Sequence, residues 1–438
     1  MVNDVGDLIA LSLDEWCARD GHRQTTIRYC SLLSVLDGVG DEERVQVGTL
    51  LRADRLRQIS PDTADDYMTL QLLAAGLAGI QSRQHDAQWN TPDGRSSAAG
   101  FPPAWKAGVN RLWWRALESG QRCVASHMDV LRWCRLPLEE WPIALDVRES
   151  DAELRLLEDG RPSAFADQAA RLVLSRDPEA ELVENRCFEL LLTVADRNAC
   201  DEASVQSAYV DLRGFLIQHP VASDLLFQEL LRRYRAKDGQ GQPWLKQWFL
   251  HAYTPRPAVG RVSLRVCNGC ANPLADGQSE CGTAGCPGAP ERREFTTMSE
   301  YYVQRRGVRR FLHDPGLAEQ RILDALEPAL GSRLHPWWGM DAVDAAVDFD
   351  GIGPMGTGEW WAADVKDHAS ATLLGRSFRW DERARARKRL LVIAQHRFER
   401  TGYVDDLLRE MDGRVKGVEV MSEQAFISAV LRRAGADG

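Results

Sequence analysis

In the stretch EWWAADVKD, at residues 359–367, two tryptophans and two alanines lead into Asp364 and Lys366, which are separated by one valine. If this stretch is a strand, its side chains alternate between two faces, so Asp364 and Lys366 share one face and Val365 lies on the other. A carboxylate beside an ammonium group at the end of a strand is suited to metal-assisted hydrolysis of a phosphodiester. The alternative is a surface ion pair, which is worth only about 0–1 kcal/mol.

A second carboxylate is available from the stretch AVDAAVDFDG at residues 342–351. This stretch also predicts a strand, with Asp344 and Asp348 on one face, and a hairpin can bring either residue beside Asp364. We favour Asp344 and leave Asp348 open. Mg²⁺ takes one or two carboxylates and keeps waters for a substrate phosphate. The metal can polarise the phosphoryl oxygen and activate a bound water, which a neighbouring lysine can orient or deprotonate.

Four of the ten cysteines are clustered between residues 267 and 286. Cys267 and Cys270 form a C-x2-C pair, and Cys281 and Cys286 form a C-x4-C pair. Two short knuckles of this kind supply the tetrahedral thiolate geometry of Zn²⁺, and four protein ligands leave no open position for catalysis. The sequence therefore predicts a structural zinc site; the alternative is a set of free or redox-active thiols.

Two basic segments are candidates for contacts with DNA. The stretch SEYYVQRRGVRRFL (residues 299–312) and the stretch SFRWDERARARKRL (residues 377–390) are both predicted to be helical. Arginines on one helix face can bind backbone phosphates, although a solvated helix face is the plain alternative. The candidate residues are Arg305, Arg306, Arg309, Arg376, Arg379, Arg383 and Arg387.

One glycine-rich loop is not expected to bind a nucleotide. GIGPMG at residues 351–356 matches G-x-G-x-x-G literally. A strand follows it, whereas the dinucleotide motif needs a helix there to bind pyrophosphate. We therefore predict a hairpin tip.

Three regions must position these residues. Residues 1–255 are predicted to be mostly helical, from segments such as TTIRYCSLLSVLDGV and from a helix start at Ser60–Pro61. Residues 256–294 are predicted to form the zinc module. Residues 295–438 alternate helices and strands, which predicts an α/β domain.

Composition restricts the class of protein. The 438 residues carry a net charge of −10 with 44% hydrophobic residues, and the acidic excess lies before residue 295. The helical region is therefore expected to bind proteins instead of DNA. No stretch is apolar enough to predict a membrane span, and no secretion signal is evident, so a cytoplasmic location is expected.

The pattern of Asp344, nineteen intervening residues, and then Asp364-Val-Lys366 resembles the PD-(D/E)xK restriction-endonuclease-like superfamily. No proline precedes Asp344, and Asp364 replaces the commoner glutamate. The resemblance implies a mixed sheet flanked by helices. It also implies a metal-assisting role for Glu319, which matches a glutamate on the helix before the sheet, and a polar site residue near Gln395.

More narrowly, three stretches that follow the predicted zinc ribbon in the sequence resemble the nuclease associated with prokaryotic PIWI modules. They are GVRRFLHDPGLAEQRIL, WWGMDAVDAAVDF and WWAADVKD. Such nucleases are encoded beside a PIWI-like protein and a DinG-like helicase, which implies those partners and an antiviral or anti-plasmid role.

The resulting hypothesis is a DNA endonuclease that depends on Mg²⁺ or Mn²⁺ and carries a structural Zn²⁺. The alternatives are a non-catalytic zinc-ribbon adaptor that binds DNA and a helical interaction protein. The sequence leaves a homo-oligomer open, and also leaves RNA open as the substrate.

Overall fold

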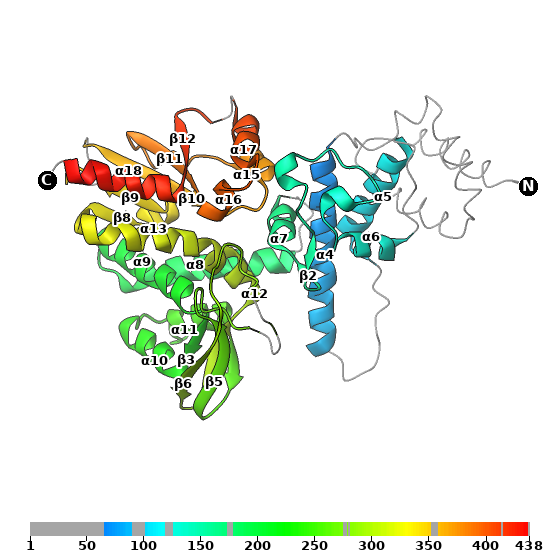
Figure 1. Cartoon of the computed structure of the whole chain (residues 1–438). Helices are drawn as coiled ribbons and strands as arrows, with labels where there is room; N and C mark the ends of the chain where they lie inside the picture. Colours follow the sequence, from blue (N-terminus) through cyan, green and yellow to red (C-terminus); the bar gives the residue numbers. More distant parts are fainter. Residues whose placement is uncertain are drawn as a thin grey trace, which may run out of the picture. The chain divides into compact units, whose positions relative to one another are not determined.

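The computed structural model divides the chain into two compact units, Met1–Asp177 and Pro178–Gly438, which are described one at a time (Figure 1). The helix predicted at TTIRYCSLLSVLDGV and the helix start at Ser60–Pro61 lie outside the described residues. Most of the loop GIGPMG does as well. The structure describes residues 65–89, 101–118, 126–172, 178–274, 278, 281–351, 358–412 and 415–436.

The first unit is helical in its described part. Helices α4 (Asp66–Trp89) and α5 (Pro103–Glu118) pack against each other through Leu70, Leu73 and Trp105, all fully buried. Their backbones approach so closely that a Cβ atom at Gly76 would lie 2.5 Å from the Cα atom of Trp105. The unit is completed by α6 (His127–Trp133), the short strands β1 (Leu157–Glu158) and β2 (Arg161–Pro162), and α7 (Ala164–Arg171).

The second unit begins with four helices: α8 (Pro178–Asn198), α9 (Glu202–Gln218), α10 (Asp224–Arg233) and α11 (Trp244–Ala252). Side chains cap two of them, because Asp201 accepts from the backbone N–H of Ser204 and Ser223 from that of Leu226. Their apolar faces bury Leu212, Phe249 and other side chains in one large core. No helix in the described ranges is long and apolar enough to cross a membrane.

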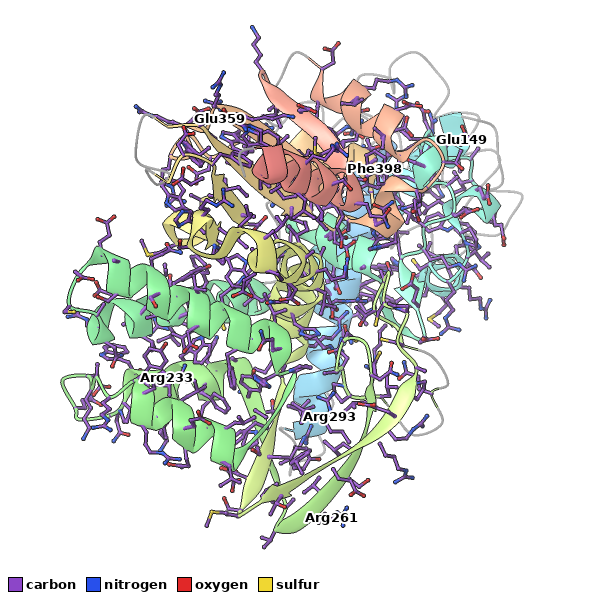
Figure 2. The ribbon with its side chains drawn as sticks, turned by 60° about the vertical axis from the view of Figure 1, so that its left-hand side comes forward. Glu149, Arg233, Arg261, Arg293, Glu359 and Phe398 are labelled. Atoms are coloured by element: carbon purple, nitrogen blue, oxygen red, sulfur yellow. The ribbon has the colours of Figure 1, made fainter. Side chains whose placement is uncertain are left out.

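Two small antiparallel sheets follow. Strands β3 (Val221–Ser223), β7 (Glu300–Gln304) and β4 (Tyr253–Pro257) form one, and β5 (Gly260–Cys267) pairs with β6 (Pro290–Thr297) in a hairpin. Figure 2 shows Arg261 and Arg293 on this hairpin. Arg261 forms an ion pair with Glu294 across the hairpin, and Arg293 forms one with Glu291 on its own strand.

The first basic segment is therefore only partly helical. Residues 300–304 form β7, because Tyr302 and Gln304 alternate into the interior while the backbone pairs with β3 and β4. Helical turns begin only after it, in α12 (Arg306–Val308) and the π-helix η3 (Arg309–His313).

A five-stranded sheet of order β12-β11-β10-β9-β8 forms the carboxy-terminal part. Strand β10 is parallel to β11 and antiparallel to β9, so the sheet is mixed, as the sequence predicted. The strands are β8 (Leu334–Pro336), β9 (Ala345–Asp348), β10 (Trp360–Lys366), β11 (Lys388–Ile393) and β12 (Val418–Ser422).

Helices cover both faces of this sheet (Figure 1). On one face, α13 (Asp314–Leu330) and α18 (Glu423–Ala436) bury Ala363 and Val365. On the other, α15 (Ala371–Ser377) and α17 (Tyr403–Met411) bury Trp360 and Ala362. Two short helices, α14 (Trp338–Asp341) and α16 (Gln395–Phe398), lie between strands.

The core on the α13 side continues into the four helices of residues 178–252. The predicted domain limits at 255 and 294 thus do not coincide with a change of core. The division into compact units falls at residue 177 instead, because α8, α9 and α11 place apolar faces against the elements that follow.

The helix predicted for SFRWDERARARKRL is wrong over most of its length. Helix α15 ends at Ser377, and residues 378–387 contain no helix. The buried side chains of this segment, Phe378, Trp380, Ala384 and Ala386, are all an even number of residues apart. These side chains belong to one core with Ala362 and Leu391. The backbone turns between them, since the N–H of Ala384 donates to the carbonyl of Asp381 and the indole N–H of Trp380 donates to the carbonyl of Ala384, both at 3.0 Å.

Candidate functional site

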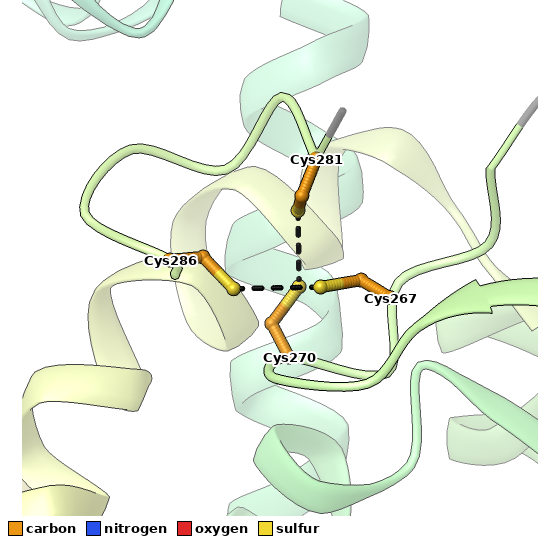
Figure 3. Close-up of side chains that lie close together, drawn as sticks. All are labelled: Cys267, Cys270, Cys281 and Cys286. Atoms are coloured by element: carbon orange, nitrogen blue, oxygen red, sulfur yellow. Dashed lines mark hydrogen bonds between the residues drawn. The ribbon is translucent and has the colours of Figure 1, made fainter. Parts of the chain in front are cut away.

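The four clustered cysteines converge on one point (Figure 3). Their sulfur atoms all lie within 4.8 Å of one another, with Cys267 Sγ 3.5 Å from Cys286 Sγ and Cys270 Sγ 3.4 Å from Cys281 Sγ. A tetrahedral zinc with Zn–S bonds of about 2.3 Å requires sulfurs about 3.8 Å apart. The donor set and its spacing therefore fit Zn²⁺.

Backbone and side-chain donors surround these sulfurs. The N–H of Gly269 donates to Cys267 Sγ at 3.4 Å, and the N–H of Thr283 donates to Cys281 Sγ at 3.5 Å. Donors of this kind stabilise thiolates, which are the form that binds zinc.

The cysteine module packs against the carboxy-terminal domain through Gly285. This glycine has a φ of +67°, and a Cβ atom there would lie 2.2 Å from Nδ1 of His396. The other ring nitrogen of His396 lies 3.2 Å from Asp367, which also accepts from Arg397 Nε at 2.7 Å. Because Asp367 directly follows Lys366, the contacts from Gly285 to His396 and from His396 to Asp367 connect the zinc module to the end of β10.

The register of β9 and β10 separates the two candidate aspartates. Ala345 pairs with Ala363, and the N–H of Asp344 donates to the carbonyl of Ala363 at 3.0 Å, so Asp344 lies opposite Asp364. Asp348 instead pairs with Trp360 at the far end of the strand. Its Oδ1 accepts from the N–H groups of Asp350 and Gly351 at 3.1 and 3.0 Å, which holds the following loop.

The charged pair on β10 completes this end of the sheet. Lys366 Nζ makes an ion pair with Asp364 Oδ1. Burial raises the pKa of Asp344, and the negative charges of Glu319 and Asp364 add to this effect. Burial would lower the pKa of Lys366, but the charges of Asp364 and Asp344 outweigh it and raise that pKa. Lys366 is therefore an ammonium group when no metal is bound.

Glu319 lies on α13 near this group, but its carboxylate is held by other residues. Its Oε2 accepts from the indole N–H of Trp337 at 2.6 Å and from Arg213 Nη2 at 3.2 Å. In the described part of the chain, the four cysteines are the only group of three or more potential ligands within 4.8 Å. Glu319 thus does not join Asp344 and Asp364 in a tight set of three carboxylates.

Sequence reasoning missed Arg213 and Trp337. Arg213 comes more than a hundred residues before the motif, on a helix with no sign of chemistry, so no spacing connects it to Glu319. Trp337 is part of WWGMD, directly before the motif strand. Its closeness to Asp344 could have been inferred from that position.

Most of the predicted DNA-binding arginines have partners on the protein. Arg376 pairs with Glu410 at 3.1 Å, Arg383 with Asp381 at 2.6 Å, and Arg387 with Glu359 at 3.5 Å. Arg305 and Arg379 donate to backbone carbonyls. Arg306 lies in α12 and Arg309 begins η3, so the set does not share one helix face.

Two family models match parts of the chain. Residues 316–438 match the model described as "REase associating with pPIWI_RE", and residues 69–223 match the model described as "pPIWI_RE three-gene island domain Y". No curated protein and no solved structure matches the chain. The first match contains the Asp344, Asp364 and Lys366 end of the sheet, and its name implies the PD-(D/E)xK superfamily. The chain thus carries two segments of the pPIWI-RE module, and the segment at residues 316–438 is restriction-endonuclease-like.

Proposed function

We propose that the chain is a metal-dependent DNA endonuclease of a PIWI-associated defence module. The observation that carries this proposal is the position of Asp344 opposite Asp364, at the strand end that bears Lys366. These residues lie within the segment that matches the restriction-endonuclease-like family model. The proposal explains why three charged groups gather at the end of an apolar strand.

Asp344 and Asp364 would hold Mg²⁺ or Mn²⁺ through their carboxylate oxygens. Two carboxylates are the usual number for Mg²⁺, which keeps other positions for water and phosphate. When bound, such a metal polarises the phosphoryl oxygen and lowers the pKa of a water ligand. Glu319, held by Arg213 and Trp337, would assist from just outside this pair.

Lys366 has a positioning and electrostatic role in this proposal. Before a metal binds, the charges of the two aspartates raise the pKa of Lys366 and keep it an ammonium group. A bound divalent cation would offset those charges, so the lysine would then orient or deprotonate the attacking water. It can donate a hydrogen bond to the attacking water and offset the negative charge that develops on the phosphate.

The remaining parts have supporting roles. The four cysteines would hold a structural Zn²⁺, with no position left for a substrate. The acidic helical region, including the part that matches domain Y, would bind the protein partners of the module, a PIWI-like protein and a DinG-like helicase. The protein would act in the cytoplasm, on DNA.

The test is plasmid cleavage by the purified full chain in Mg²⁺ or Mn²⁺. Asp364→Asn and Lys366→Met should each abolish nicking while the unfolding temperature stays close to that of the wild type. A variant that cleaves like the wild type would overturn the site assignment. Binding of DNA without any metal dependence, and without nicking in any metal, would instead favour the adaptor.

A further inference from the structure

The segment directly before Asp344 adopts an unfavourable backbone conformation. Trp337, Met340 and Asp341 have φ values of 43°, 53° and 74°, which non-glycine residues rarely adopt. Such conformations persist only where the surrounding structure holds them, and they gather at functional sites. The segment is tied to the site, because the N–H of Trp337 donates to the carbonyl of Asp344 at 2.9 Å.

Gln206 on helix α9 holds this segment through its backbone. Its side-chain amide donates to the carbonyls of Trp337 and Pro336 at 2.9 and 3.2 Å. Its Oε1 accepts from the N–H of Met340 at 3.1 Å. One side chain therefore satisfies three backbone groups of the strained turn.

Arg213 lies two helical turns further along α9 and contacts the side chains of Glu319 and Asp341. Its Nη2 lies 3.3 and 3.2 Å from the two carboxylate oxygens of Glu319, and 3.9 Å from Asp341 Oδ2. Trp337 donates its indole N–H to the same glutamate. Only 6% of the Arg213 side chain is exposed, so DNA cannot reach the guanidinium.

Helix α9 comes from a different part of the chain than the nuclease motif. It lies within residues 69–223, which match domain Y, and outside residues 316–438, which match the restriction-endonuclease-like model. One charged group from α9 nevertheless lies among the acidic residues of the nuclease-like segment. Arg213 stands among Glu319, Asp341 and Asp344, as Lys366 stands beside Asp364.

We infer that Arg213 and Gln206 are positioning residues of the nuclease site, supplied by a helix outside the nuclease-like segment. Arg213 acts through Glu319, whose two carboxylate oxygens it contacts, and Gln206 acts through the turn that precedes Asp344. The inference rests on the proposed function and deepens it, because it adds two residues of α9 to those that hold the site in place.

The decisive measurement is the rate of cleavage at saturating DNA by full-length Arg213→Met, together with its Mn²⁺ dependence. Misplacement of site groups by about 1 Å should lower kcat roughly 10- to 100-fold and raise the Mn²⁺ concentration for half-maximal rate. The affinity for DNA, measured with Ca²⁺ in place of Mn²⁺, should stay within about twofold, because a buried arginine makes no phosphate contact. Arg233→Met, on α10, is the matched control and should change neither kcat nor the Mn²⁺ dependence.

A second comparison separates positioning from plain stabilisation. If Arg213 acts through Glu319, adding Arg213→Met to Glu319→Gln should cause no further loss of kcat. Trp337→Phe removes the indole donor to Glu319 together with part of a buried ring, so it should reproduce part of the kcat loss even if Arg213→Met folds poorly.

Three results would overturn the inference. An unchanged kcat in both Arg213→Met and Trp337→Phe would do so, and so would losses that multiply in the double variant. A lower unfolding temperature with normal kcat per folded molecule would show that Arg213 is only structural. In contrast, a wild-type protein that never cleaves would overturn the proposed function itself, and the inference with it.

Discussion

The carboxylate of Asp344 accepts a hydrogen bond from the backbone N–H of Val365 at 2.6 Å. Val365 stands between Asp364 and Lys366, so this bond fixes the first aspartate to the part of β10 that carries the charged pair. The backbone of Asp344 makes a second link, to the carbonyl of Ala363. Asp344 is therefore held to β10 by both its side chain and its backbone. Asp348 instead lies beside Trp360, at the other end of the pairing.

This relationship predicts opposite outcomes for two equivalent substitutions. Asp344→Asn should reduce plasmid cleavage by about 100-fold or more, because it removes a charged oxygen ligand of the metal. Asp348→Asn is the matched control. Its amide oxygen can still accept from the N–H groups of Asp350 and Gly351, so the loss of stability should be about 1 kcal/mol and cleavage should persist. Loss of cleavage in the Asp348 variant alone would point to the other aspartate as the ligand.

The strands of the site could be predicted from the sequence because they follow period two. Ala345, Val347, Ala363 and Val365 contact one core, and Ala346, Trp360 and Ala362 contact the other, as the alternation requires. The cysteine cluster was predictable for a similar reason, since the C-x2-C and C-x4-C spacings are local.

Two parts of the site could not be predicted. The contact between Arg213 and Glu319 depends on how α9 packs on α13, and such packing has no local signature. The segment after Ser377 was predicted to be a helix because its arginines have high helix propensity. Burial of Phe378 and Trp380 overrides that propensity, so the tertiary structure decides the conformation.

Loss of zinc should destabilise the protein and also reduce cleavage. Cys281→Ser removes one of four ligands, and the unfolding temperature should fall by about 10 °C or more. Cleavage should fall as well, because Gly285 packs on His396, which contacts Asp367 beside Lys366. The measurements are zinc content, thermal unfolding and nicking of a plasmid. Cys200→Ser, at an exposed cysteine outside the cluster, should behave like the wild type; equal zinc content in both variants would contradict the assignment.

The buried cluster around Asp367 should make stability depend on pH in the acid range. Burial would raise the pKa of Asp367, but His396 and Arg397 outweigh it and lower that pKa. A carboxylate with a lowered pKa stabilises the fold above its unfolded-state pKa, near 3.9, and this contribution is lost as the pH falls through the folded-state pKa.

Asp367→Asn should therefore lower the free energy of unfolding by roughly 3 kcal/mol at pH 7, since it leaves the buried Arg397 without its anion. The difference from the wild type should shrink below about pH 4, where the wild-type carboxylate also begins to lose its charge. Urea unfolding at several pH values measures this. A difference that stays constant from pH 7 to acid pH would show that charge does not contribute.

The arginines that remain accessible should decide DNA affinity. Arg387 forms an ion pair with Glu359, yet 73% of its side chain is exposed. Glu359 is also bound by Arg433. Because exposed ion pairs are weak, Arg387 can exchange Glu359 for a phosphate. Arg376, in contrast, is half-exposed and pairs with the largely buried Glu410 at 3.1 Å.

Arg387→Ala should therefore weaken DNA binding a few-fold and reduce the slope of log affinity against log salt by about 0.9, the value for one lost phosphate contact. Arg376→Ala is the matched control and should leave that slope unchanged. Fluorescence anisotropy with a short duplex, titrated at several salt concentrations in Ca²⁺, gives both slopes. If both variants reduce the salt slope equally, the geometry of their ion pairs does not decide which arginines contact DNA. If neither variant changes the slope, the second basic segment does not contact the DNA backbone.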